Sequence, residues 1–277
     1  RAGSFPHRGR RRCGQVHFRT AGEGGVPLVM LHASPGSAKQ LEGLIAPLAE
    51  RRRVVALDTR GNGDSTPLAI EQPSIFDFAT ATLEALDALG ITQCDLYGTH
   101  TGASIAMECT LARPRLVRRL VVDGMGLYAP AEQEELLRTY APAITPDLDA
   151  RHLMWAWHFC RDQFVFWPWF KREAGHVRTV GLPDPGTLHE MVLEVMKGLR
   201  SYHQSYRAAF RHPKRERLAM LRIPTLACCA RNDMLRPHLD EMAALIPGAR
   251  KAELEDNTTR AECEASARLI AEFLDRA

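Results

Sequence analysis

A tight turn between a strand and a helix constrains the fold of this chain most strongly. The short apolar run 94–97 predicts a strand, and the stretch that begins at Ala103 has helical character. Between them stands Gly98-Thr99-His100-Thr101-Gly102. The two glycines allow a sharp turn and close packing of the helix on the strand. We therefore expect the side chain of His100 to project above the sheet, at the N-terminus of the helix.

Strands and helices alternate along most of the chain. This alternation predicts an α/β fold, a mostly parallel sheet with helices on both faces. The uninterrupted apolar run 26–31 is typical of a strand that is buried on both sides. The expected strands are 26–31, 53–57, 94–97, 120–122, 224–229 and 251–254, and the expected helices are 37–51, 75–89, 103–113, 238–245 and 262–274.

A long helical interval, residues 131–218, interrupts this alternation. It holds all four tryptophans, among them Trp167 and Trp169 in an aromatic cluster. These aromatic side chains either fill the interior of the interval or form the wall of a pocket for an apolar or aromatic substrate. We predict a core made of 14–130 and 219–277, an inserted helical lid over 131–218, and a disordered tail over 1–13.

Composition restricts the partners and the compartment. The formal net charge is only +3, and much of the basic excess lies in the arginines of the first 12 residues, which we interpret as a solvated tail and not as a nucleic-acid arm. No apolar run is long enough to span a membrane. Seven cysteines, an odd number, favour free thiols in a reducing cytoplasm. We expect a small-molecule substrate and no partner of nucleic acid or membrane; a homodimer stays open.

Four landmarks, taken in order, resemble the α/β-hydrolase fold superfamily over about residues 14–275. Their order and spacing, more than any single motif, carry the resemblance. In that superfamily the turn at 98–102 is the nucleophile elbow, G-x-S-x-G, and here His100 stands where the serine is expected. The landmarks are the loop 31–36, the turn 58–65, the elbow 98–102, and the strand and loop 223–233.

The resemblance implies a Ser-Asp-His triad, and this chain departs from it twice. His100 replaces the serine, and the loop 254–260, where the histidine is expected, contains none. Thr258 or Thr259 occupies that place. Asp233 matches the usual acid, and Asp123, after the strand 120–122, is a second candidate because some members of the superfamily place the acid there.

His100 can act as a general base or as a nucleophile. We expect the positive end of the helix dipole to lower its pKa and so to favour the neutral imidazole. The backbone N–H of Thr101, with an N–H near Ala33, is expected to form an oxyanion hole. The alternative is that His100 only fills the turn of an inactive protein.

Three further side chains are candidates for contact with the substrate. His32 lies in the loop after the first core strand, where hydrogen bonding within the loop is the simpler role. Ser34, beside it, can hydrogen-bond to a substrate. His203 lies in the expected lid and can reach the pocket from there. No H-x-x-x-H or C-x-x-C spacing indicates a metal site, so we expect neither a metal nor another cofactor.

Three functions are consistent with these residues. The leading one is a cofactor-free hydrolase acting on an ester, lactone or ketone-type bond through His100. The second is a lyase, decarboxylase or isomerase that needs only a base and an oxyanion hole. The third is an inactive ligand-binding protein with the same fold.

Overall fold

An eight-stranded sheet forms the centre of the computed structural model, which describes residues 2–9 and 12–276. The order of strands across the sheet is β1-β2-β4-β3-β5-β6-β7-β8. In this order, β4, β3, β5, β6, β7 and β8 run parallel to one another. At one edge, β1 pairs antiparallel with β2, and β2 pairs antiparallel with β4. The bounds are β1 (Ala2–Gly9), β2 (Arg12–Ala21), β3 (Leu28–Leu31), β4 (Val54–Leu57), β5 (Cys94–Thr99), β6 (Val117–Asp123), β7 (Thr225–Ala230) and β8 (Arg250–Leu254).

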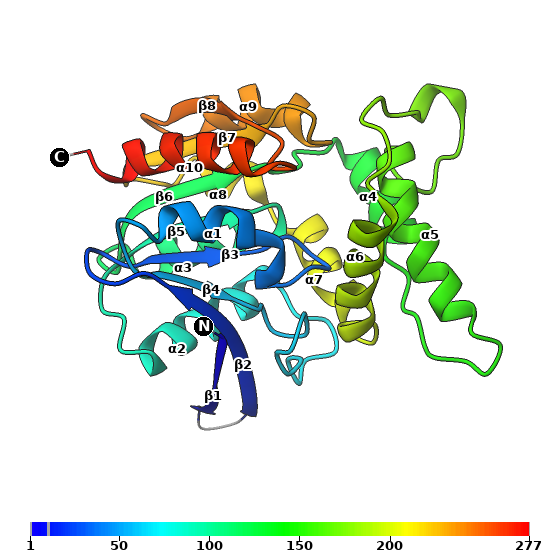
Figure 1. The fold of residues 1–277 in the computed structure, drawn as a ribbon, viewed down its shortest axis with the longest axis horizontal. Helices are drawn as coiled ribbons and strands as arrows, with labels where there is room; N and C mark the ends of the chain where they lie inside the picture. Colours follow the sequence, from blue (N-terminus) through cyan, green and yellow to red (C-terminus); the bar gives the residue numbers. More distant parts are fainter. Residues whose placement is uncertain (1, 10–11, 277) are drawn as a thin grey trace.

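Helices cover both faces of this sheet, as the alternation in the sequence predicts. Figure 1 shows α1 and α10 on one face, and α2 and α3 on the other. Strands β3 and β4 are buried along their whole length because helices lie on both sides of them. A further helix, α9, packs beside β7 and β8. The bounds of these helices are α1 (Glu42–Leu48), α2 (Ile75–Ala88), α3 (Thr101–Ala112), α9 (Leu239–Leu245) and α10 (Arg260–Leu274).

A run of five helices connects β6 to β7, and we call residues 130–218 the helical insertion. In Figure 1 its helices α4, α5 and α6 lie to one side of the sheet. Tyr140, Phe159 and Trp169 meet in its interior with edge-on ring contacts. These rings belong to the same buried cluster as the side chains of α2 and α3, so the insertion packs onto the core. Its helices are α4 (Pro130–Thr139), α5 (Arg151–Val165), α6 (Pro185–Lys197), α7 (Tyr202–Arg211) and α8 (Lys214–Leu218).

The N-terminal residues correct one expectation. The sequence predicts a disordered tail over 1–13; residues 1, 10 and 11 lie outside the described part of the chain, and Ala2–Gly9 pairs with Arg12–Arg19 in an antiparallel ribbon. This segment is held by backbone pairing, which its arginine-rich composition does not reveal.

Among the described residues, no helix is both long enough and apolar enough to cross a membrane.

Candidate active site

The turn 98–102, which we call the elbow, joins β5 to α3 in a strained backbone conformation. His100 has φ 51° and ψ −109°, a region that non-glycine residues seldom adopt. Close packing explains the flanking glycines: a Cβ on Gly98 would lie 2.2 Å from the carbonyl oxygen of Gly102, and one on Gly102 would lie 2.3 Å from that of Leu31. The backbone N–H of His100 donates to the carbonyl of Asp123 at 3.0 Å and so ties the elbow to β6. The strain is thus held by neighbouring strands.

The imidazole of His100 forms a hydrogen bond with the carboxylate of Asp233. His100 Nε2 lies 2.7 Å from Asp233 Oδ2, and the two side chains are 24% and 21% exposed. Asp233 is held by the backbone N–H of Leu235, which donates to Oδ1 at 2.7 Å. The acid therefore orients the ring, with the proton of Nε2 directed to Asp233 and the lone pair of a neutral ring on Nδ1.

The electrostatics of this pair correct a second expectation. Burial lowers the pKa of His100, but the charge and hydrogen bond of Asp233, with the charge of Asp123, outweigh it, so the pKa is raised above 6.5. The predicted lowering by the helix dipole is therefore wrong, because a carboxylate in direct contact acts more strongly than the dipole. The pKa of Asp233 is lowered, since the charge of His100 and its hydrogen bonds overcome burial.

Asp123, the second candidate acid, has a different partner. Its carboxylate accepts a hydrogen bond from the Tyr97 hydroxyl on β5. Burial raises the pKa of Asp123 to about 6, and the charge of Asp233 acts in the same direction. Asp123 thus lies in the site and influences His100 through charge, while Asp233 holds the ring directly.

A pocket of about 550 Å³ opens above the elbow, between the carboxyl ends of the strands and the helical insertion. His100, Asp123 and Asp233 line it. The insertion contributes aromatic rings and two basic side chains, a composition that suits an apolar molecule with a negative or polar end. These insertion residues are Tyr140, Phe164, Trp167, Arg178, Tyr206, Phe210 and Lys214.

The two expected oxyanion donors differ in the structure. Thr101 lines the pocket and is the first residue of α3, so its N–H has no acceptor within the helix. The N–H of Ala33 donates to Gln40 Oε1 at 3.0 Å. The N–H of Ala33 itself is therefore paired within its loop in this structure, and an oxyanion donor near Ala33 stays a prediction.

Ser34 and His32 have separate roles. Ser34 lines the pocket, and its hydroxyl donates to Ser205 Oγ at 2.7 Å, so its oxygen remains able to accept from a ligand. His32 is buried within its loop: Nδ1 contacts the carbonyl of Ala33 at 2.8 Å, and Nε2 accepts from the N–H of Thr59 at 3.0 Å. His32 therefore fixes the loop and does not line the pocket, which corrects its place among the substrate contacts.

The aromatic candidates of the insertion separate in the same way. Trp167 lines the pocket. Trp169 is buried away from it, with Nε1 donating to the carbonyl of Tyr140 at 3.0 Å. His203, on α7, is likewise not among the residues that line the pocket in the described chain. The structure therefore favours the interior role for Trp169, which lies in the turn after α5, and it places His203 outside the pocket; the sequence did not show which of these side chains face the pocket.

The place of the expected triad histidine is occupied by a helix cap. Thr259 is the N-cap of α10, and its side chain accepts from the N–H of Glu262, which in turn accepts from the N–H of Thr259. Asp256, in the same loop, accepts from the backbone and side chain of Asn232. This loop therefore serves the local fold, and it supplies no imidazole.

Arg178 and Lys214 are two of the three Lys and Arg residues that line the pocket in the described chain, and sequence reasoning did not single them out. Arg178 donates to the backbone carbonyls of Gln163 and Asn232, at 2.5 and 2.8 Å, and so bridges the insertion and the loop of Asp233. Lys214, the first residue of α8, is buried and lines the pocket. Neither belongs to a recognisable motif, and only the burial of a charged side chain reveals them.

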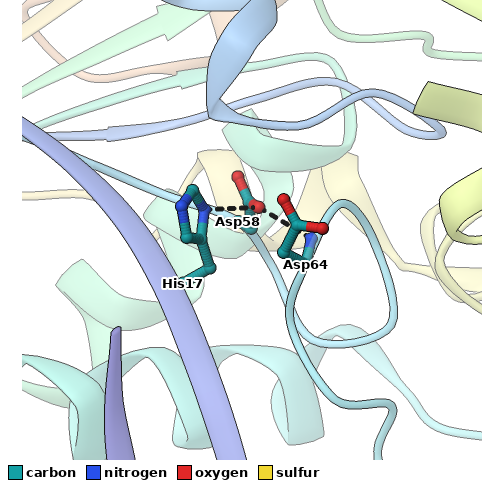
Figure 2. A group of neighbouring side chains, drawn as sticks. All are labelled: His17, Asp58 and Asp64. Carbon is teal, nitrogen blue, oxygen red and sulfur yellow. Dashed lines mark hydrogen bonds and ion pairs between the residues drawn. The ribbon is translucent and has the colours of Figure 1, made fainter. Parts of the chain in front are cut away.

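A group of His17, Asp58 and Asp64 lies outside the pocket, and its atoms are close enough to hold a cation. Figure 2 shows His17 pointing to Asp58, with Nδ1 2.9 Å from Oδ2. The same carboxylate accepts from the N–H groups of Asp64 and Ala38, at 2.9 and 2.8 Å. Asp64 forms an ion pair with Lys197. These contacts account for the carboxylates without a metal, so we interpret the group as an anchor for the turn 58–65.

Comparisons with known proteins agree with this architecture. The profile of the alpha/beta hydrolase fold family matches residues 26–167, half of the chain. The chain therefore belongs to that family, which confirms the predicted fold. A thermophilic esterase from Thermogutta terrifontis has a similar structure, with a TM-score of 0.75 and 16% identity over 99% of this chain and 98% of that one; at this identity it shows the fold alone.

Two curated relatives have related names. A 2-hydroxy-6-oxononadienedioate/2-hydroxy-6-oxononatrienedioate hydrolase from Pseudomonas putida is 37% identical over 40% of this chain, and the match spans 41% of that relative's length. A hydrolase of the same name from Escherichia coli is 28% identical over 87% of this chain and 82% of the relative. Because the stronger match spans only two fifths of its relative, the activity of the whole protein does not follow from it.

Proposed function

We propose that this protein is a cofactor-independent hydrolase that cleaves an ester, lactone or ketone-type bond in a small, semi-apolar substrate. The observation that carries this proposal is the hydrogen bond between His100 and Asp233 at the floor of the pocket. An imidazole that a carboxylate orients, and whose pKa the charge and hydrogen bond of that carboxylate raise against the effect of burial, can act as a general base when it is neutral.

Water is the nucleophile in this mechanism. His100 Nδ1 takes a proton from a water molecule, whose oxygen attacks the carbonyl carbon of the substrate. The electron pair of the C=O bond moves to oxygen, where the N–H of Thr101 stabilises the charge. When the tetrahedral intermediate collapses, His100 returns the proton to the leaving group. Direct attack by the ring is disfavoured because Nε2 is bound to Asp233, and Nδ1 is crowded by the Cβ of its own side chain.

The pocket indicates the substrate class. The aromatic residues Tyr140, Trp167 and Phe210 suit an unsaturated or aromatic body, and Arg178 suits a carboxylate or another acceptor at one end. The relatives' names describe keto acids with two carboxylates. We therefore favour a carbonyl compound that bears an acidic group, with the helical insertion acting as a lid over it.

The free thiols of the chain support the expected compartment. Cys94, Cys109 and Cys228 are buried and unpaired. Buried free thiols of this kind are typical of proteins from a reducing environment, so we place the protein in the cytoplasm.

A cofactor-free lyase or isomerase is the second candidate. The feature that favours it is position 100 itself: the base faces the pocket without an intervening serine hydroxyl. The same base can remove a proton from a carbon beside a carbonyl, and Thr101 can stabilise the resulting enolate.

A substrate screen with three proteins tests the proposal. Esters, lactones and β-dicarbonyl acids are assayed with the unmodified protein, His100→Ala and His152→Gln. His152 also contacts an aspartate, Asp147, outside the pocket, and is the matched control. We expect His100→Ala to lower kcat/KM by about 10²–10⁴-fold and His152→Gln to leave it unchanged.

Labelled water separates the outcomes. In H₂¹⁸O, hydrolysis places ¹⁸O from the solvent in the product acid, whereas isomerisation does not. In D₂O, exchange of a substrate C–H for deuterium would indicate a lyase or isomerase. Turnover that survives in His100→Ala would refute the role of His100. Tight ligand binding without turnover would identify the protein as a binder.

A further inference from the structure

Lys214 is set apart from the other lysines by its environment. The sequence has five lysines, and four of them pair with carboxylates: Lys39 with Glu190, Lys171 with Glu135, Lys197 with Asp64 and Glu194, and Lys251 with Asp240. Lys214 instead donates to the backbone carbonyl of Ala209 at 2.5 Å and lies 5.8 Å from the centre of the Tyr128 ring. Its amine is thus buried against a helix end and an aromatic ring.

This environment favours the neutral amine. Burial lowers the pKa of Lys214 to about 7, and the nearby positive charge of Arg215 acts in the same direction. A neutral amine keeps two N–H bonds and one lone pair. One N–H satisfies the carbonyl of Ala209, which leaves the lone pair for another partner.

Lys214 also shares the pocket with the proposed base. It lines the same pocket as His100 and Asp233. Tyr128, whose ring it faces, lines the pocket too; burial raises the pKa of its phenol, and the charge of Asp233 acts in the same direction. The amine is therefore placed where a bound carbonyl compound can meet it.

We infer that Lys214 is a second reactive group of the pocket, which captures aromatic or unsaturated aldehydes and ketones as a covalent imine. The amine lone pair attacks the carbonyl carbon, a C–N bond forms, and the C=O electron pair moves to oxygen. Both amine protons pass to that oxygen, the C–O bond breaks, and water leaves. An imine withdraws electrons from the adjacent carbon and makes its C–H bonds more acidic.

Reductive trapping tests this inference without any need for turnover. The full-length protein is treated at pH 7 with benzaldehyde and cyanoborohydride, and the labelled lysines are mapped by peptide mass spectrometry. At this pH about half of an amine with a pKa near 7 is neutral, compared with less than about 0.1% of an ordinary lysine. We expect Lys214 to be labelled at least about tenfold faster than Lys251, which is exposed.

Two variants and one denatured sample provide the controls. Lys214→Met should remove the dominant label, and Lys251→Met should leave it unchanged. In urea the preference for Lys214 should disappear, because the burial that lowers its pKa is lost. Labelling of Lys214 no faster than that of Lys251 in the folded, unmodified protein would refute the inference, even if Lys214→Met fails to fold. The result does not depend on the role proposed for His100.

Discussion

Replacing Asp233 with asparagine tests the central contact of the site. The change removes a negative charge 2.7 Å from His100 Nε2 and keeps the shape of the side chain. In the unmodified protein burial lowers the pKa of His100, and the charge and hydrogen bond of Asp233 are the largest opposing effects. In Asp233→Asn, burial and the positive charge of Arg178 should prevail, so the pKa of His100 should fall.

The same substitution should reduce stability in a definite pH window. Because the pKa of His100 is raised in the folded state, protonated His100 stabilises the fold. This stabilisation is complete below pH 6.5 and is lost as the pH rises through the folded-state pKa of His100. The lowered pKa of Asp233 stabilises the fold above pH 3.8, and this is lost as the pH falls through its folded-state pKa. A hydrogen bond between charged groups contributes about 1.5–3 kcal/mol. We expect a loss of that size near pH 5 and a smaller loss at pH 9.

The assay is an NMR titration of the histidine ¹³Cε1 signals, combined with urea unfolding at pH 5 and pH 9. The His100 signal is assigned by its absence in His100→Gln. Asp147→Asn, beside His152, is the matched control and should leave the His100 titration unchanged. If the inflection of His100 stays in place or moves to higher pH in Asp233→Asn, the electrostatic account of the pair is wrong.

Two further predictions concern the elbow and the insertion. Gly98→Ala should destabilise the protein by about 3 kcal/mol, because its Cβ would meet the Gly102 carbonyl oxygen at 2.2 Å. Gly175→Ala is the control: no atom lies within 4 Å of the added Cβ, so the free energy of unfolding should change by no more than about 0.5 kcal/mol. Thermal unfolding of both variants tests this, and equal effects would contradict the packing argument. Trp169→Ala should cost about 3–5 kcal/mol because the ring is buried. Trp167→Ala should instead weaken ligand binding more than stability, as measured by titration and unfolding, and the reverse pattern would show that the two rings are assigned wrongly.

The core of the fold could be predicted because its signals are local. Strands 94–97 and 224–229 were expected from short apolar runs, and the structure has β5 and β7 there with ends that differ by at most two residues. Helix 262–274 was expected from its periodicity, and α10 begins two residues earlier, after the Thr259 cap. Apolar runs of this kind determine burial directly, whichever partner covers them.

The parts that failed depend on distant partners. Strand β1 is held by pairing with β2, and its own sequence carries no apolar alternation to indicate a strand. The sequence left open whether Asp233, 133 residues away, orients His100 or a polar group of the substrate, and it did not show that the contact with His100 would reverse the expected pKa shift. The segment after α5 directs Trp167 to the pocket and buries Trp169, and this difference likewise results from tertiary packing.

The two departures from the family's triad have one structural explanation. An imidazole at position 100 reaches the carboxylate of Asp233 directly, so a histidine after β8 has no acid left to bind. The loop 254–260 is then free to serve the helix, and Thr259 caps α10. What the site loses is the hydroxyl between base and substrate. What it keeps is an imidazole oriented by a carboxylate beside a helix N-terminus, which under the proposed function acts on water or on a substrate C–H without an acyl-enzyme. If His100 is the base, as proposed, its contact with Asp233 accounts for the absence of both the serine and the second histidine.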